Sequence, residues 1–526
     1  MNTSIVNFST IDYIIFIVYM AILVLVGLWV SRTKKGQVKD SDDYFLAKHS
    51  LTWWAIGTTL IASNISAEQF IGMSGSGFKS GIAIASYEWI SAIMLIIIAK
   101  WFLPVFISKR IYTMPQFLEQ RYDSRVRTSL AVFWLALYVF VNLTSVLYLG
   151  GLALKTVFGI SLEYAIYGLA IISAMYTIYG GLTAVAWTDV IQVSVLIIGG
   201  FITTILALSA ISGGHGPLAG FADMMKQAPD KFHLILAKNN PEFTNLPGIR
   251  VILTGLWITG MSYWGCSQYI TQRALAAKSM KEAQRGLIFA GYLKLLIPFI
   301  VVLPGIAAFV LRADITKADQ AYPWLVNSFI PAGIKGIALA ALAGAIVSAL
   351  SSMINATATI FTFDIYKKYI KREATEKNMV LTGRISSFAA ILIAVIIAPA
   401  LKNLDQAFQF IQEYTGFISP AIFALFFYGL FWKRATSNSV LIAAAISIPV
   451  SALLKYIFPL LPFLDRIGVV FLIISAVIIV VSLLESKKNH PGAIELKKDL
   501  FKTDWVFNIG ATGIMLILIA LYIVFW

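Results

Sequence analysis

A polar cluster interrupts the apolar stretch 53–73, which is long enough to cross a bilayer. The cluster falls in IASNISAEQF (61–70), and GMSGSG (72–77) follows with three glycines. Hydrocarbon offers such groups no hydrogen bonds, so they are tolerated only where they line a cavity. The pattern predicts a helix that unwinds here and exposes main-chain carbonyls, which suit a hard cation such as sodium. The polar members are Asn64, Ser66, Glu68 and Gln69.

The carbonyls near Ala62 and Ile65 are candidate sodium ligands, and a hydroxyl from another helix would join them. The stretch AGAIVSALSSMINATATIF (343–361) is rich in such hydroxyls. We expect most of them to bond back to their own helix or to hold helices together. The polar members of this stretch are Ser348, Ser351, Ser352, Asn355, Thr357 and Thr359.

Two charged residues lie well inside apolar segments, Glu88 in IASYEWISA and Lys294 in FAGYLKLLIPF. A charge at the bilayer centre costs about 2.5–3.5 kcal/mol on insertion scales, so these side chains are expected to face a cavity or each other. The functional interpretation places them at a ligand. The alternative is a purely structural ion pair.

Neutral amides accompany these charges, because Asn142 and Gln412 also lie inside apolar segments. Together with Gln69, Glu88 and Lys294 they suit a neutral polyhydroxyl ligand, whereas a carboxylate ligand favours an arginine fork or a helix N-terminus. Nearby aromatic rings could stack on the apolar face of a sugar, although ordinary packing explains most rings in a bundle. These rings belong to Tyr87, Tyr263, Trp264 and Phe408.

Asp189, in VAWTDVIQV, lies near the start of another apolar segment. It could pass a cation towards the cytoplasm, or it could cap the helix that begins there, where an acidic residue is favourable. The sequence supports the two interpretations equally.

The elements that position these residues are membrane-spanning helices. The 526-residue chain is 59% hydrophobic and 13% charged, which indicates an all-α, multi-pass membrane protein. About fourteen apolar segments are long enough to span. They lie near 12–30, 53–74, 81–107, 128–156, 161–181, 188–211, 249–270, 284–310, 333–361, 379–400, 405–432, 439–457, 465–485 and 506–526.

Lys and Arg gather in every second connection, which predicts that these connections are cytoplasmic. The net charge of +15 therefore reflects topology and does not indicate a nucleic-acid partner. An even number of spans then places both termini outside the cell, on the periplasmic side of an inner membrane. The basic connections are 32–39, 109–127, 273–285, 367–372, 433–434 and 487–502.

Several classes of protein lose support. The lone Cys266 excludes an internal disulfide and a cysteine-based metal site. No HExxH motif, Walker loop or nucleophile–base set is visible, which argues against an enzyme or an ATP-driven pump. The first span lacks a basic leader and a cleavage site, so we expect it to be a retained helix. The run 109–127 is expected to form an amphipathic helix at the membrane surface.

A second broken helix is predicted in LTGLWITGMSYWGCSQY (253–269), which contains Gly255, Gly260 and Gly265. Each broken segment opens a block of five spans, a pattern typical of inverted-repeat transporters with a site at the midplane. The alternative is that these glycines only let helices pack closely. The predicted division is an extra helix and basic loop (1–50), repeat 1 (51–211), an outer loop (212–248), repeat 2 (249–434) and three accessory helices (435–526).

Several long motifs, in order and with similar spacing, closely resemble the sodium/solute symporter family over nearly the whole chain. They are LIASNISAEQFIGMSGSG, IASYEWISA, FVNLTSVLYLGGLAL, IYGGLTAVAWTDVIQ, NATATIFTFDIY, QAFQFIQEYTG and GLFWKRATS. The resemblance implies a LeuT-type fold and import of a galactose- or glucose-like sugar with sodium as the coupling ion.

The resemblance also implies roles for individual residues. Tyr263 would be the inner gate, stacked on the sugar and held by Asn64. Asp189 would lie on the sodium exit path. The implied sugar contacts are Gln69, Glu88, Ser91, Asn142, Lys294 and Gln412; the outer lid is Met73, Tyr87 and Phe408; and the sodium ligands are the carbonyls of Ala62, Ile65 and Ala345 with the hydroxyl of Ser348.

Two positions depart from the family pattern. Gly260 stands where a galactose-transporting member of the family has an asparagine that contacts the sugar, and Ala349 stands where the family has a second hydroxyl after Ser348. The first departure bears on the identity of the sugar, and the second predicts a lower sodium affinity. The alternatives are a symporter or uniporter for another neutral solute, such as a polyol or an amino acid, and a sugar-binding membrane sensor.

Overall fold

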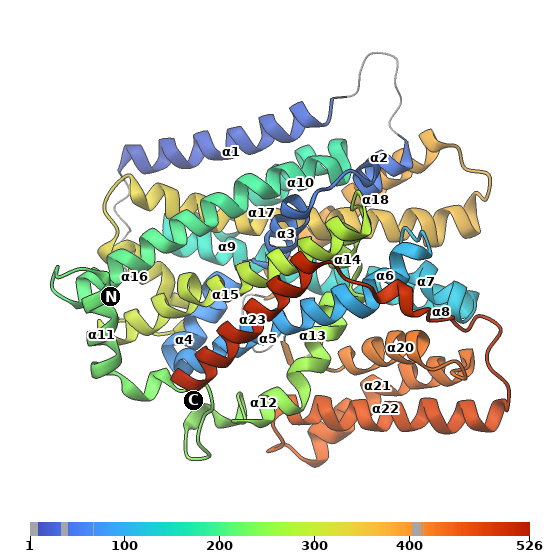
Figure 1. The fold of residues 1–526 in the computed structure, drawn as a ribbon. Coiled ribbons are helices and arrows are strands. Elements are labelled where there is room, and N and C mark those ends of the chain that lie inside the picture. Colours follow the sequence, from blue (N-terminus) through green and yellow to red (C-terminus); the bar gives the residue numbers. More distant parts are fainter. Residues whose placement is uncertain (1–8, 33–39, 67, 402–411, 414) are drawn as a thin grey trace.

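The computed structural model describes residues 9–32, 40–66, 68–401, 412–413 and 415–526, and its regular elements are helices (Figure 1). The predicted all-α class is confirmed. The α-helices are α1 (Thr10–Val30), α2 (Ser41–Leu46), α3 (Trp53–Asn64), α4 (Ser74–Ser80), α5 (Ser86–Ile97), α6 (Leu103–Ser108), α7 (Met114–Arg121), α8 (Ser124–Ala136), α9 (Thr144–Phe158), α10 (Leu162–Ile211), α11 (Pro217–Gln227), α12 (Arg250–Leu253), α13 (Gly255–Cys266), α14 (Gln268–Leu275), α15 (Met280–Val310), α16 (Ala321–Phe329), α17 (Ile334–Ile360), α18 (Glu376–Ile397), α20 (Ser419–Phe431), α21 (Ser437–Ile457), α22 (Phe463–Glu485) and α23 (Trp505–Val524). Four π-helical segments continue or precede these helices: η2 (Glu68–Met73), η4 (Ile98–Phe102), η5 (Leu137–Leu143) and η9 (Phe361–Ile370).

Within the described part of the chain, ten helical segments are long and apolar enough to cross a membrane. One of them, α10, has 50 residues, or ~75 Å at 1.5 Å per residue, which is more than twice the hydrocarbon thickness. The chain kinks inside it at Gly181, where φ is 63°. A Cβ at this position would lie 2.3 Å from the Tyr44 carbonyl oxygen, so only glycine fits. Because other spans are broken or merged in similar ways, the count of fourteen stays a prediction.

The helices differ in how deeply they are buried. In the apolar window of Ile334–Ile370, which contains α17, 94% of residues are buried, against 17% for α23 and 22% for α1. The core of the bundle therefore runs along α17 and its neighbours α10 and α3. Helices α1 and α22 lie at opposite edges of the bundle, and α23 runs across its front face (Figure 1).

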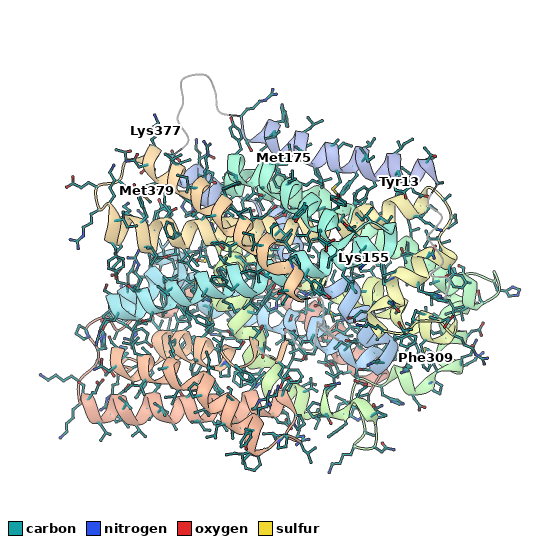
Figure 2. All side chains as sticks on the ribbon, turned by 180° about the vertical axis from the view of Figure 1, so that it is seen from behind. Tyr13, Lys155, Met175, Phe309, Lys377 and Met379 are labelled. Carbon is teal, nitrogen blue, oxygen red and sulfur yellow. The ribbon has the colours of Figure 1, made fainter. Side chains whose placement is uncertain are left out.

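The connections between helices lie at two opposite ends of the bundle. Helix α1 begins and α23 ends at the end that carries α11 and α16, whereas α2 and α7 lie at the other end (Figure 1). In the reverse view, Phe309 marks the first end and Lys377 the second (Figure 2). Hydrogen bonds tie the first end together, since the Leu234 amide donates to the Phe525 carbonyl at 2.6 Å and the Gly333 amide to Asp12 at 2.7 Å.

The basic run 109–127 contains the short helix α7 and the first turn of α8, and α7 packs into the protein. Phe117 and Leu118 are fully buried, and the Phe117 ring stacks on Phe426 of α20 with 5.6 Å between centroids. The buried Arg121 donates to the carbonyls of Gly429 and Trp432, at 2.7 and 2.9 Å, just where α20 ends. The expected amphipathic helix thus presents its apolar side to α20.

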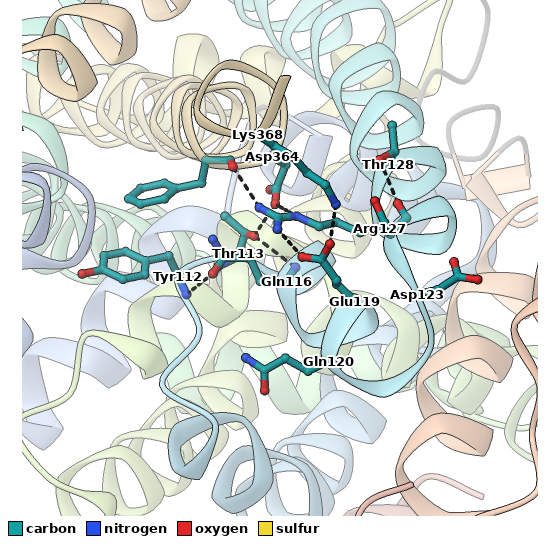
Figure 3. A network of polar contacts seen from close by, with 12 residues as sticks. Tyr112, Thr113, Gln116, Glu119, Gln120, Asp123, Arg127, Thr128, Asp364 and Lys368 are labelled. Carbon is teal, nitrogen blue, oxygen red and sulfur yellow. Dashed lines mark hydrogen bonds and ion pairs between the residues drawn. The ribbon is translucent and has the colours of Figure 1, made fainter. Parts of the chain in front are cut away.

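A polar network joins this run to the end of α17 and η9 (Figure 3). Arg127 Nε lies 2.7 Å from Asp364 Oδ1, which also accepts from the Thr113 hydroxyl at 3.0 Å. Glu119 pairs with both Arg127 and Lys368. Burial raises the pKa of the Glu119 carboxyl, but the hydrogen bonds and positive charges of Lys368 and Arg127 outweigh this effect. The pKa of Glu119 therefore lies below its ordinary value. The network keeps the basic connections at this end of the bundle in fixed contact.

The first predicted break is present. Helix α3 ends at Asn64, and Ile65 is extended, with φ −79° and ψ 116°. The last helical bond runs from the Ile65 amide to the Ile61 carbonyl at 2.9 Å. Beyond it, the amide and hydroxyl of Ser66 both donate to Gln69 Oε1, at 3.0 and 3.1 Å. This local side-chain acceptor competes with the helical ladder and stops it.

The second predicted break is also present, but the glycines do not cause it. Gly260 and Gly265 lie inside α13, where added Cβ atoms would meet Met94 at 3.1 Å and Ile98 at 3.2 Å. They serve close packing. The chain is extended instead at Ser267 (φ −78°, ψ 131°), between α13 and α14. Tyr138 of η5 bonds the Ser267 hydroxyl and accepts from the amide of the next residue, both at 3.0 Å.

Candidate functional site

A cavity of about 140 Å³ lies between the two breaks and is lined by α3, α5, η5, α13 and α15 together with residues near the start of α20. It brings together residues that are up to 359 positions apart in the sequence, from Ser63 to Ile422. Nearly all of the predicted sugar-contact and gate residues line it. They are Asn64, Gln69, Tyr87, Glu88, Ser91, Asn142, Tyr263, Lys294 and Gln412, and Gly260 lies among them.

The two intramembrane charges meet in this cavity. Lys294 Nζ contacts Glu88 Oε2 and Asn64 Oδ1, and the side chains of Lys294 and Glu88 are 1% and 5% exposed. The ammonium also lies 4.9 Å from the centre of the Trp264 ring, within cation–π range. The structure thus satisfies both expectations, because the charges pair with each other and also face the cavity. Together they present a donor and an acceptor to a neutral ligand.

Tyr263 and Asn64 also meet, since Asn64 Nδ2 donates to the Tyr263 hydroxyl at 3.0 Å. Asn64 therefore holds Tyr263 with its amide nitrogen and Lys294 with its amide oxygen. This arrangement fixes the ring of Tyr263 at the junction of the first break and α13. If Tyr263 acts as a gate, its movement would be coupled through Asn64 both to the break at the end of α3 and to the Lys294–Glu88 pair.

Other polar groups of the cavity are fixed by local bonds. The Ser91 hydroxyl donates to the Tyr87 carbonyl at 2.6 Å, so its oxygen remains available as an acceptor. Gln69 lines the cavity and accepts from Ser66 with its side-chain oxygen, so its NH₂ group is the part that can donate to a ligand. These bonds reduce the side-chain freedom that a ligand would otherwise have to restrict.

The outer-lid residues are divided. Tyr87 lines the cavity, and its role in the lid stays a prediction. Met73 lies at the end of η2, is fully buried and is not among the cavity-lining residues. Phe408 lies outside the described residues, and its role stays a prediction.

The predicted sodium ligands lie where α3 unwinds beside α17. Ala62 and Ile65 sit at the end of α3, and Ala345 and Ser348 lie on α17; all four are buried. The Ser348 hydroxyl donates to Asp189 Oδ1 at 2.5 Å. That bond uses the hydroxyl hydrogen and leaves the oxygen lone pairs for a cation. Asp189 therefore orients the one hydroxyl of the set.

Asp189 lies inside α10, eight residues after the kink at Gly181. A carboxylate acts on a helix terminus only within the first turn, so this position does not fit the capping interpretation. The contact with Ser348 instead places Asp189 beside the predicted sodium ligands.

Arg273 was counted among the cytoplasmic basic residues on sequence alone, and that placement is wrong. Its side chain is fully buried in α14. It donates to Thr59 Oγ1 at 3.1 Å and to the Tyr269 carbonyl at 2.5 Å, and it contacts Ser352. Its guanidinium lies 3.8 Å from Asp189 Oδ2. The sequence offered no signal for this role, because a basic residue after an apolar span is ordinarily a topology determinant.

Comparisons with known proteins bear on the family and the fold. Residues 44–446 match the model of the "Sodium:solute symporter family". The chain is 53% identical over 98% of both lengths to the sodium/glucose cotransporter of Vibrio parahaemolyticus. It is 34% identical to the sodium/myo-inositol cotransporter 2 of Mus musculus, over 81% of this chain and 67% of the relative.

Solved structures support the fold. A Na⁺-coupled sialic acid symporter superimposes with a TM-score of 0.80 at 24% identity, covering 91% of this chain and 98% of the other. Mhp1, a nucleobase-cation-symport-1 family transporter, superimposes with a TM-score of 0.52 at 15% identity, covering 90% and 100%. At these identities the likeness establishes an all-helical, LeuT-like transporter fold.

Proposed function

The chain belongs to the sodium:solute symporter family, and on this premise we propose that it imports a neutral sugar by secondary active transport coupled to sodium. The 53% identity to a sodium/glucose cotransporter over nearly the full length supports a glucose- or galactose-like substrate. The protein is a transporter and not an enzyme, as its family indicates. It acts within the lipid bilayer as a multi-pass protein.

The observation that carries this proposal is the cavity between two broken helices, with a paired acid and base and neutral amides on its wall. The Lys294–Glu88 pair has no net charge, so a neutral ligand leaves the electrostatic balance of the cavity unchanged. The amides of Asn142 and Gln412 add donors and acceptors for hydroxyl groups. We assign Gln69 and Ser91 to the same ligand, with Tyr263 stacked on its apolar face.

For sodium, we propose the carbonyls of Ala62, Ile65 and Ala345 with the Ser348 hydroxyl. All are oxygen donors, as a hard cation requires. Two of them depend on the interruption of α3, because an intact helix would direct its carbonyls into its own hydrogen bonds. Sodium binding would thus stabilise the same local backbone that carries Asn64 and Gln69, which gives a physical route for coupling sodium to sugar.

The transport cycle follows from these assignments. Sodium from outside orders the break in α3 and completes the sugar site, and the outer aromatic residues close. The two repeats, 51–211 and 249–434, then rock against each other. The Tyr263 ring moves aside to open the inner gate, and sodium leaves past Asp189. We propose that both termini face the periplasm, with 1–50 and 435–526 outside the repeats. One charge moving through 100 mV contributes about 2.3 kcal/mol.

Transport against a gradient is the decisive test. In proteoliposomes with an inward sodium gradient, labelled glucose or galactose is expected to accumulate above its outside concentration, and replacing sodium with choline should abolish accumulation. Binding without accumulation would support a sensor, and sodium-independent equilibration would support a uniporter. Because Gly260 leaves one cavity wall without an amide, unlabelled hexoses, myo-inositol and amino acids should be compared as competitors, with hexoses expected to compete best.

A substitution at Ala349 tests the predicted sodium affinity. Ala349 is fully buried on α17, directly after Ser348. Changing Ala349→Ser restores a second hydroxyl, and an added ligand should lower the sodium concentration for half-maximal sugar uptake by about two- to fivefold. The measurement is initial uptake against sodium concentration. An unchanged half-saturation in a variant with normal maximal uptake would contradict the prediction.

A further inference from the structure

Arg273 joins four elements around the predicted sodium site. It reaches Thr59 of α3 and Ser352 of α17, and it lies beside Asp189 of α10, while its own backbone belongs to α14. Ser352 in turn bonds Ser63 and the Ser348 carbonyl, at 2.9 and 2.8 Å. The permanent positive charge of Arg273 is therefore separated from the proposed sodium ligand Ser348 by the hydroxyl of Ser352. Arg273 lies in α14, which follows the second break.

The contact between Arg273 and Asp189 is an incomplete ion pair. The 3.8 Å separation is longer than a hydrogen bond, and within the described residues Asp189 Oδ2 has no hydrogen-bond partner. By contrast, the pair of Arg127 with Asp364, whose side chains are 11% and 0% exposed, is closed at 2.7 Å (Figure 3). An open pair of full charges in a dry interior can tighten when a nearby cation leaves and loosen when one arrives.

We propose, on the basis of the sodium-coupled transport inferred above, that Arg273 is an internal counter-cation that neutralises Asp189 when sodium leaves. With sodium bound, the Asp189 carboxylate is shared between sodium and Arg273, and repulsion between these two cations lowers the affinity for sodium. With sodium gone, Arg273 and Asp189 balance each other, so the empty carrier holds no bare buried carboxylate. Arg273 thereby permits the empty carrier to return, and it acts as a positioning residue that touches neither sugar nor sodium.

The inference separates two transport modes. Net uptake from a sodium-containing outside into an empty vesicle requires the empty carrier to return in every cycle. Exchange of labelled for unlabelled sugar, with sodium on both sides, does not require that step. A counter-cation is needed for the first mode only, whereas a residue that merely holds the fold is needed for both.

The experiment compares Arg273→Gln with wild type in proteoliposomes. Net uptake is expected to fall by about tenfold or more, exchange to stay within about threefold, and the sodium half-saturation in exchange to decrease, because an unopposed Asp189 attracts sodium more strongly. Removing the carboxylate as well, in Arg273→Gln with Asp189→Asn, should recover part of the net uptake relative to the single variant.

Arg121→Gln is the matched control. Arg121 is equally buried but contacts backbone carbonyls of α20, so its loss should lower both modes together, along with thermal stability. If Arg273→Gln behaves in the same way, or raises the sodium half-saturation, the counter-cation role is wrong. If Arg273→Gln does not insert, Arg273→Lys decides: net uptake and exchange should both persist, and a selective loss of net uptake would contradict the proposal. A wild type without sodium-driven accumulation would instead refute the proposed function.

Discussion

Changing Glu88→Gln is expected to lower sugar uptake by about two orders of magnitude. The substitution leaves the Lys294 ammonium in a cavity whose described lining residues then include no carboxylate, and removing one member of a buried pair costs about 3–5 kcal/mol. Lys294 would then draw Asn64 towards itself and disturb the bond that holds Tyr263. The measurement is initial uptake of labelled sugar against sugar concentration, together with thermal unfolding of the purified protein.

A charge-neutral double variant separates ligand binding from stability. Glu88→Gln with Lys294→Gln removes both charges, so it should regain most of the thermal stability lost in the single variant while uptake stays low. Glu163→Gln is the matched control, because Glu163 is an exposed carboxylate in the first turn of α10 and should affect neither. Uptake of normal rate and affinity in Glu88→Gln would remove the central polar contact from the proposed site.

The two breaks show what the sequence can predict and where it stops. The first is predicted at the correct place from the polar cluster, because the groups that stop the helix, Ser66 and Gln69, belong to that cluster and bond each other locally. The second was foreseen within the correct segment, but for the wrong residues. Ser267 is extended because Tyr138 supplies its hydrogen bonds, and Tyr138 is 129 positions away. A single sequence does not specify such a long-range partner.

Arg273 and α10 illustrate the same limit in other ways. The positive-inside pattern assigns the basic connections to one side of the membrane but cannot separate a loop arginine from one folded back into the core. Gly181 ends one predicted span without any polar loop, so hydropathy predicted the two segments but not their continuity in α10. In contrast, the charges and amides predicted for the site do line one cavity, since such groups in hydrocarbon are rarely tolerated away from one, and their roles stay predictions.

Changing Ser348→Ala is expected to raise the sodium concentration for half-maximal uptake by about tenfold or more, because it removes the only side-chain ligand of the proposed site. Asp189 would also lose its 2.5 Å hydrogen bond. At saturating sodium, maximal uptake should recover substantially, since the proposed sugar contacts line the cavity and Ser348 is not among its described lining residues. The measurement is sugar uptake against sodium concentration, with sugar saturating.

Ser173→Ala provides the control for this substitution, because Ser173 is an equally buried serine whose hydroxyl only bonds back to the Leu169 carbonyl of its own helix. It should leave the sodium half-saturation unchanged. Thermodynamic reciprocity predicts a second effect of Ser348→Ala. If sodium raises sugar affinity through the break in α3, the sugar concentration for half-maximal uptake at low sodium must rise as well. A shift in sodium dependence without that rise would locate sodium away from the end of α3. A variant with unaltered sodium dependence would exclude Ser348 as a ligand.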